Sequence, residues 1–224
     1  GQPGSAVPSG QDFFLEYIRN AYRHILSQID ISTGQTADSQ GGMDLTTAGA
    51  PGIVQAAITA AERGEIDPAE ANSIVRNMVG FFLHNEFDPN DFDSLCPYTK
   101  AVLHYLRPGT DIGAGNSEAS LIELFFVAAS LLTFREWKDV EEETAAMIDE
   151  FIDRIDLRRL MFETEVAGTL DYENLSYGFL HSGYTLQGPD TLSEYVPMCY
   201  LLGAGIAIAQ GDRELAQILS KAYY

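Results

Sequence analysis

The sequence is short of lysine and of positive charge in general, and this shortage excludes several classes of partner. Lysine occurs only at positions 100, 138 and 221, and 13 basic residues face 33 acidic ones for a formal net charge of −20. A surface with this charge repels nucleic acid and anionic membranes, so we predict no nucleic-acid partner and no membrane insertion. A basic protein is the partner that it would attract, unless the acidity reflects source composition or halophilic adaptation.

Cysteine is also scarce, and no apolar run is long enough to cross a bilayer. Cys96 and Cys199 are interpreted as buried free thiols, with a single disulfide as the alternative in an exported protein. The most apolar runs, residues 121–134 and 195–209, are shorter than the roughly 20 residues of a membrane span and are predicted to be core helices. We therefore expect a soluble protein, with the cytoplasm slightly favoured over export.

The common signatures of metal, cofactor and nucleophile chemistry are missing. None of the four histidines (His24, His84, His104 and His181) follows a glutamate by three positions, and no His-Glu-x-x-His, Cys-x-x-Cys or Gly-x-Ser-x-Gly motif occurs. The glycines of GAGIAI (203–208) lie within an apolar helical run, without the strand that precedes a dinucleotide-binding turn. We predict no metal and no cofactor.

One stretch, HNEFDPNDFDSLCPY at residues 84–98, concentrates acidic side chains in a short segment. A calcium loop that starts at Asp88 would have phenylalanine at position 5 and threonine at position 12, where oxygen ligands are required. Asp-Pro-Asn-Asp is typical of turns, and Pro97 suits the first turn of a following helix. We interpret the stretch as a structural turn, with a metal site or catalytic carboxylates as alternatives.

Helical periodicity, in contrast, is frequent. Residues 14–29 carry apolar side chains at three- and four-residue spacing, and two hairpins have a glycine stop followed by an aspartate cap, Gly64 with Asp67 and Gly211 with Asp212. We predict an all-α, single-domain bundle of about eight to ten helices over residues 9–224, possibly stacked helical hairpins. Residues 1–8 are interpreted as a tag remnant and disordered N-terminus, and flexible loops are expected near 32–46 and 168–190.

The predicted helix after residue 140 has one strongly acidic face, which motivates the leading functional hypothesis. That face carries Glu141, Glu142, Glu143, Asp149, Glu150 and Asp153. It is either a solvated outer face or a docking surface for a basic protein. Because no catalytic motif is present, the favoured hypothesis is an acidic protein–protein interaction module: an adaptor, a chaperone-like protein or an inhibitor of the immunity type.

The alternative hypothesis is a hydrolase or lyase with a pocket in the helical bundle. Its lining would combine one carboxylate with a glycine- and tyrosine-rich loop, namely Glu123 with Tyr172, Tyr177, His181 and Tyr184. Glu123 stands among apolar residues, so it is predicted either at the rim of its helix or buried in an ion pair with Arg135 or an arginine of residues 154–159.

Overall fold

The computed structural model is mostly helical, as predicted. It describes residues 10–30, 34–37, 45–46, 49–84, 102–103, 105–106, 119–155, 157, 183–185, 188–189 and 196–222. The helices are α1 (Gly10–Ser27), α2 (Ala50–Glu62), α3 (Pro68–His84), α4 (Leu121–Arg135), α5 (Glu142–Asp153), α7 (Val196–Ala209) and α8 (Arg213–Ala222). The multi-helix architecture is confirmed, although the described residues form seven helices and not eight to ten.

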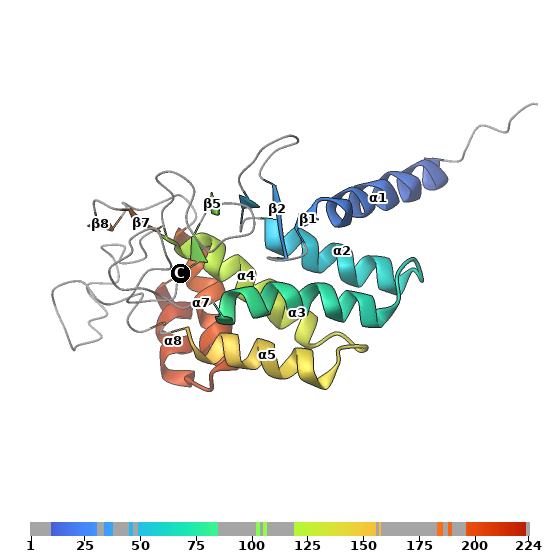
Figure 1. Cartoon of the computed structure of the whole chain (residues 1–224). Coiled ribbons are helices and arrows are strands. Elements are labelled where there is room, and N and C mark those ends of the chain that lie inside the picture. Colours follow the sequence, from blue (N-terminus) through green and yellow to red (C-terminus); the bar gives the residue numbers. More distant parts are fainter. Residues whose placement is uncertain are drawn as a thin grey trace, which may run out of the picture.

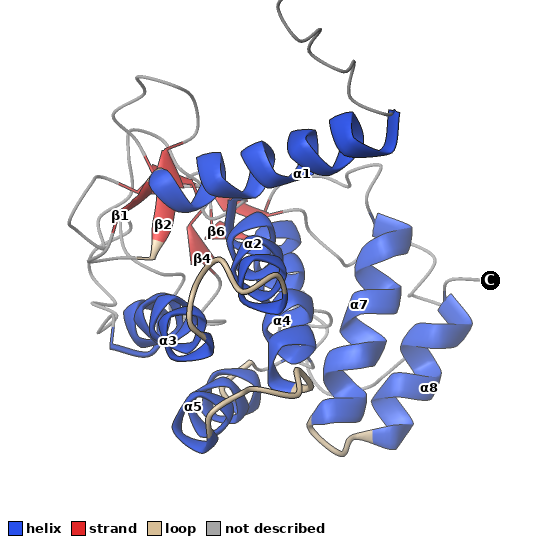
Figure 2. Ribbon diagram, turned by 90° about the vertical axis from the view of Figure 1, so that its right-hand side faces the viewer, coloured by secondary structure: helices blue, strands red, loops and turns tan. Residues whose placement is uncertain are grey.

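The helices divide into an apolar row and an amphipathic set that flanks it. Helix α4 packs against both α2 and α7, and these three helices carry few charged residues. Helices α1, α3, α5 and α8 pack beside this row (Figure 2). Most of their charged side chains are exposed. Side chains from both sets fill one continuous core, among them Ile53 and Phe125 of the apolar row and Val75, Ile148 and Leu219 of the flanking helices. An all-apolar helix must be buried on most sides, which explains why α2, α4 and α7 lie side by side.

The two predicted helical hairpins form, each with the expected glycine at the end of one helix and aspartate at the start of the next. Gly64 and Gly211 adopt positive φ values of 67° and 78°, the left-handed conformation that ends a helix at little cost only for glycine. Asp67 Oδ1 accepts a hydrogen bond from the Ala69 N–H at 2.8 Å, and Asp212 Oδ1 accepts one from the Leu215 N–H at 3.0 Å. Each aspartate therefore caps the helix that follows the glycine.

A buried asparagine, which the sequence analysis did not single out, joins α3 to the connection between α4 and α5. The Asn72 side chain is fully buried. Its amide nitrogen donates to the carbonyl oxygens of Pro68 and Asp139, and its oxygen accepts from the Glu141 N–H at 2.9 Å. All the polar atoms of this side chain are satisfied, so its burial fixes the position of residues 139–141 against α3.

Eight short strands were not predicted. They are β1 (Ile29–Asp30), β2 (Gln35–Ala37), β3 (Leu45–Thr46), β4 (Val102–Leu103), β5 (Tyr105–Leu106), β6 (Ala119–Ser120), β7 (Gly183–Thr185) and β8 (Gly188–Pro189). They form two antiparallel sheets, in the orders β1-β2-β3-β5 and β4-β6-β7-β8. Strands of two or three residues are too short to show polar–apolar alternation, which is why ranges 32–46 and 168–190 were predicted to be loops.

The first sheet contacts α3 at a glycine. Gly34 lies between β1 and β2 with a φ of 66°, and it is buried. A Cβ atom at this position would lie 2.6 Å from the Met78 Cα atom in α3. Only a residue without a side chain allows this approach of backbone to backbone. Among the described residues, no helix is both long and apolar enough to cross a membrane.

Candidate functional site

The two ends of the bundle differ in how the helices are connected. At one end, the α2–α3 turn and the α4–α5 connection lie together, because Trp137 Nε1 donates to Glu62 Oε1 at 2.6 Å and Lys138 Nζ lies 3.1 Å from the same oxygen. The strands lie at the other end, where α2 and α4 begin (Figure 1). Long connections at one end of a rigid scaffold are where binding and catalytic groups usually gather, so the strand-bearing end is the candidate site.

Two of the sequence-predicted site residues are brought to this end together. Strand β7, which contains Tyr184, pairs with β6 so that Tyr184 is opposite Ala119 and Gly183 is opposite Ser120. Helix α4 begins directly after β6, and Glu123 lies in its first turn, four residues after Ala119. Tyr184 and Glu123 are 61 positions apart in the sequence, and the β6–β7 pairing places their backbones close together.

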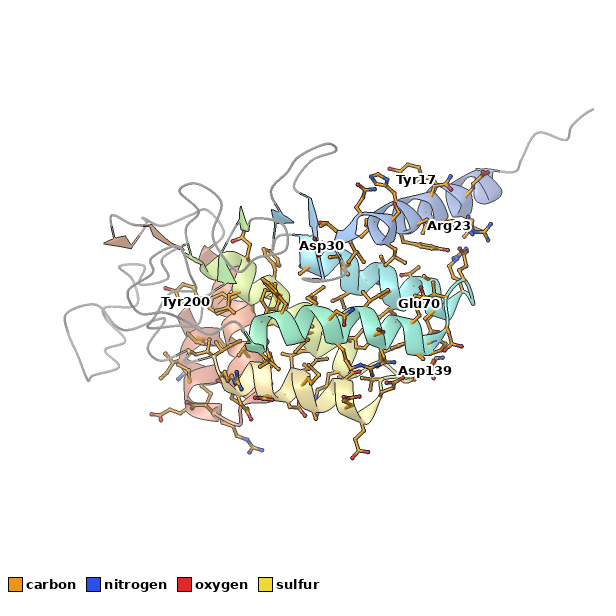
Figure 3. The ribbon with its side chains drawn as sticks, viewed as in Figure 1. Tyr17, Arg23, Asp30, Glu70, Asp139 and Tyr200 are labelled. Atoms are coloured by element: carbon orange, nitrogen blue, oxygen red, sulfur yellow. The ribbon has the colours of Figure 1, made fainter. Side chains whose placement is uncertain are left out.

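The two sheets adjoin, and the first adds a carboxylate that the sequence analysis missed. A single residue, position 104, separates β4 of one sheet from β5 of the other. Asp30 is half-buried and ends β1 in the sheet that contains β5. Figure 3 shows Asp30 and Tyr200 toward the strand-bearing side, with Arg23, Glu70 and Asp139 toward the other end. Nothing in the local sequence marks Asp30, because its position follows from pairing between segments distant in the chain.

Glu123 is half-buried, and the ion pair with Arg135 that we considered for it does not form. Both residues belong to α4, and 12 residues of helix separate them by about 18 Å. Arg135 bonds instead to Asp149, with Nε 2.6 Å from Oδ1 and Nη2 3.2 Å from Oδ2, and also to Glu136. Its hydrogen bonds to Asp149 and Glu136 raise the pKa of Arg135 above its usual value. Arg154 is likewise engaged, by Glu150 and by the Leu83 carbonyl oxygen.

The predicted acidic face of α5 is partly neutralised within the chain. Glu141 bonds to Arg76 of α3, Asp149 to Arg135 of α4, and Glu150 to Arg154, which directly follows α5. Glu143 also lies 3.7 Å from Arg76, so four of the six carboxylates that were proposed to bind a basic protein already have an arginine partner. Recognition by a basic partner stays a prediction, now with fewer free charges to support it.

Two hollows in the surface of the described residues are candidates for a binding site. One, of about 400 Å³, is lined by side chains of α4 and α5 and by Ala209 of α7, and it includes Arg135 and Asp149 in their ion pair. Another, of about 590 Å³, lies between α1 and α3 and borders the first sheet at Ile29 and Gly34. Among the residues that the structure describes, no group of three or more metal-ligating side chains converges. The first hollow includes Asp149 and Asp153 of the predicted acidic face, and neither hollow is lined by Glu123.

Several predicted residues lie outside the described ranges. They include His181, Tyr172 and Tyr177 of the aromatic loop, and most of the acidic stretch 84–98 with Cys96. The backbones of Tyr184, Cys199 and His84 are described within β7, α7 and α3. Of the residues that the enzyme hypothesis named, the structure therefore describes Glu123 and the backbone of the strand that contains Tyr184.

Comparison with solved structures identifies the same fold in larger proteins. The chain is similar to an endo-β-1,2-glucanase from Chitinophaga pinensis, solved with sophorotriose and glucose, with a TM-score of 0.61, 18% identity and coverage of 88% of this chain and 47% of that one. It is also similar to putative glucoamylases from Bacteroides fragilis (TM-score 0.61, 16% identity, 91% and 49% covered) and Bacteroides uniformis (0.62, 14%, 89% and 47%). The chain therefore spans about half the length of these structures. No family model and no curated protein sequence matches it.

These neighbours overturn the leading functional hypothesis. Each carries the name of a glucan-cleaving enzyme, and none that of an adaptor or inhibitor. The prediction of a protein–protein interaction module was wrong. It relied on net charge and on missing motifs, and neither of these identifies a fold.

Proposed function

We propose that the chain is part or all of a glycoside hydrolase that cleaves a glucan, with its active site at the strand-bearing end of the bundle. The observation that carries this proposal is the fold: at least 86% of the chain superposes on each of four solved structures with glucanase or glucoamylase names. It also agrees with the hydrolase alternative derived from the sequence. At identities of 14–18%, the likeness concerns architecture, so the chemistry must come from this chain's own residues.

Cleavage of a glycosidic bond requires two carboxyl groups on opposite sides of that bond. One protonates the leaving oxygen, and the other either activates a water molecule or attacks the sugar carbon. Within the described residues, Glu123 and Asp30 are the half-buried carboxylates that lie on or directly beside a strand. We assign the first test to Glu123, because β7 pairs with β6, the strand directly before its helix, and we take Asp30 as the candidate for the second carboxylate.

The position of Glu123 also suits a charged catalytic group. The first turn of a helix stabilises a carboxylate through the unpaired N–H groups and the helix dipole. Leu124 and Phe125, which follow Glu123, are fully buried, so the backbone of this turn is fixed by the core. A tyrosine such as Tyr184 on the adjacent strand offers the flat apolar surface and hydroxyl group that sugars use.

The test is an assay of reducing-sugar release from linear β-1,2-glucan and from soluble starch, the two classes of glucan that the neighbours' names indicate. Glu123→Gln keeps the shape of the side chain and removes its acid–base function, so we expect about a 10²–10⁴-fold loss of rate. Glu142→Gln, at an exposed position on α5, is the matched control and should retain full activity.

The possible outcomes distinguish an error in the proposed activity from an error in the assignment of Glu123. If neither glucan nor a wider panel of oligosaccharides is cleaved by the folded chain, the proposed function is wrong. If a glucan is cleaved and Glu123→Gln remains fully active, the function stands and the assignment of Glu123 is wrong. Thermal unfolding of both variants excludes loss of structure as the cause of any lost activity.

A further inference from the structure

The hollow between α1 and α3 has a floor of aliphatic side chains that the core holds in position. Its volume of about 590 Å³ is within the roughly 300–1,000 Å³ that is usual for small-molecule sites. Four half-buried side chains form the floor, namely Leu26, Ile29, Ile66 and Ile74. All four pack against the buried clusters of the bundle. The floor is therefore apolar and formed before any ligand binds.

One wall of this hollow is the polar face of α3, which carries little charge for this chain. Glu70, Ser73 and Asn77 line the hollow and are exposed. Their spacing of three and four residues places them on one side of the helix, over about 10 Å of its length. The exposed positions of α5, in contrast, are mostly carboxylates, in a chain that has 33 acidic residues. Uncharged polar side chains therefore distinguish this wall from the solvated face of α5.

The opposite wall is the end of α1, where Arg23 is held in place by Glu65. The Nε and Nη2 atoms of Arg23 lie 2.8 and 2.7 Å from Oε2 of Glu65, which belongs to the turn between α2 and α3. Among the described residues that line the hollow, the charged ones are Arg23 and Glu70, and their charges cancel. Figure 3 shows these two side chains on α1 and α3, with Asp30 closer to the strand-bearing end. The hollow is thus electrically balanced in a chain whose net charge is −20.

This lining matches an uncharged ligand that has many hydroxyl groups. Serine hydroxyls and the asparagine amide both donate and accept hydrogen bonds, as sugar hydroxyls do, whereas carboxylates only accept and arginine only donates. A charged ligand would lose hydration here without a net opposite charge to compensate. The hollow beside α4 and α5 is different, because Arg135 there is paired with Glu136 and Asp149. Aliphatic side chains between polar walls also suit the apolar face of a sugar ring.

We propose that the α1–α3 hollow is a saccharide-binding site that holds a segment of the glucan beside the point of cleavage. The choice of a glucan among polyhydroxyl ligands rests on the proposed function, whereas the hollow and its lining do not. Ile29 and Gly34 border the hollow from the first sheet, and Asp30, the candidate second carboxylate, directly follows Ile29. A glucan chain that lies along α3 therefore leads toward the strand-bearing end. Glu123 does not line the hollow, so this site is additional to the position where that carboxylate would act.

The experiment is an NMR titration of the whole chain with its isoleucine δ1 methyl groups labelled. The probes are sophorotriose, which was bound to one of the neighbouring structures, and maltotriose, a fragment of starch, with glycerol as the control. We expect the Ile66 and Ile74 signals to shift with at least one trisaccharide, with a Kd of about 1 mM, because the hollow is open and offers few hydrogen bonds. The signals of Ile53 in the core and of Ile208 on the exposed side of α7 should not shift. The sugar signals in the same spectra report any hydrolysis.

Two variants of the α3 wall test whether the hollow itself binds the sugar. Ser73→Trp fills the hollow from an exposed position and should weaken binding at least about tenfold, since it removes the space for the ligand. Asn77→Ala removes one hydrogen-bonding side chain and should weaken binding about three- to tenfold. The matched controls Gln217→Trp and Gln217→Ala, at an exposed position on α8, should bind as the unaltered protein does.

The titration and the hydrolysis assay can fail separately. The proposal is overturned if neither trisaccharide shifts Ile66 and Ile74, if glycerol shifts them equally, or if Ser73→Trp binds as well as Gln217→Trp. Should a glucan nevertheless be cleaved, the hydrolase proposal stands and this binding site is wrong. Shifts of Ile66 and Ile74 that Ser73→Trp abolishes, in a chain that cleaves no glucan, would establish the saccharide site and count against the hydrolase.

Discussion

Replacement of Gly34 by alanine tests how the first sheet is held on the helical bundle. Gly34, Gly64 and Gly211 have nearly the same positive φ, of 66°, 67° and 78°. An L-residue in this conformation costs roughly 1–2 kcal/mol, and the stiffer unfolded chain of alanine offsets about 0.4–1 kcal/mol of this. If backbone conformation were the whole effect, alanine at the three positions would destabilise the protein equally.

The surroundings of the three glycines differ, and the difference sets the magnitude. An added Cβ atom has open space at Gly64 and Gly211, but at Gly34 it would lie 2.6–2.8 Å from the Cα, N and Cβ atoms of Met78. Carbon atoms make their best contacts at about 3.5–4.0 Å, so the β1–β2 turn or α3 must move by close to 1 Å. We expect about 1 kcal/mol for Gly64→Ala and Gly211→Ala, and about 4 kcal/mol for Gly34→Ala.

Thermal unfolding measures this contrast directly. For a chain of this size, 1 kcal/mol corresponds to roughly 2–4 °C in Tm, so Gly34→Ala should lower Tm by about 8–16 °C and the two controls by about 2–4 °C. On the proposed function, Gly34→Ala should also reduce glucan hydrolysis at temperatures where the protein remains folded, because the sheet that contains Asp30 is displaced. Equal losses of Tm for all three variants would refute the close contact between Gly34 and α3.

Two further predictions concern the opposite end of the bundle. Asn72→Ala should destabilise the protein by about 2–4 kcal/mol in urea unfolding, because it leaves the buried polar groups of Asp139 and Glu141 without partners, and a loss below about 1 kcal/mol would contradict this role. The hydrogen bond from Trp137, followed by that from Lys138, lowers the pKa of Glu62. Because the folded-state pKa lies below the unfolded one, the stabilisation from Glu62 is present above the unfolded pKa and is lost as pH falls through the folded pKa. The fluorescence of Trp137, which is the single tryptophan, should therefore change with a midpoint below the usual range of a glutamate, and Glu62→Gln should abolish that transition.

The hydrolase proposal changes how the acidity of the chain is understood. An excess of 20 negative charges was first taken as a sign of a basic partner, yet Arg76, Arg135 and Arg154 already engage four carboxylates of the α5 face. A neutral glucan neither gains nor loses from such a surface. Reversal of charge at Glu142 and Glu143 should therefore leave glucan cleavage unchanged.

The helices and their turns followed from the sequence because their causes are local. Apolar spacing, a glycine that ends a helix and an aspartate that caps the next one act within a few residues, and Gly64 with Asp67 and Gly211 with Asp212 behave as predicted. The apolar run 203–208 was likewise identified as helix and not as a nucleotide-binding turn, since an isolated glycine pattern lacks meaning without a preceding strand.

Tertiary structure alone decided which distant residues meet. Strands of two or three residues leave no periodic signal, so the pairing of Tyr184 with Ala119 and the approach of Gly34 to Met78 could not be read from the chain. The same holds for the partners of Arg135, which bonds to Asp149 and Glu136 and lies too far along its own helix to reach Glu123. Sequence determined the local elements because hydrogen bonds and side-chain entropy act between near neighbours. The candidate site depends on packing between segments that the sequence separates by tens of residues, and only the folded chain brings them together.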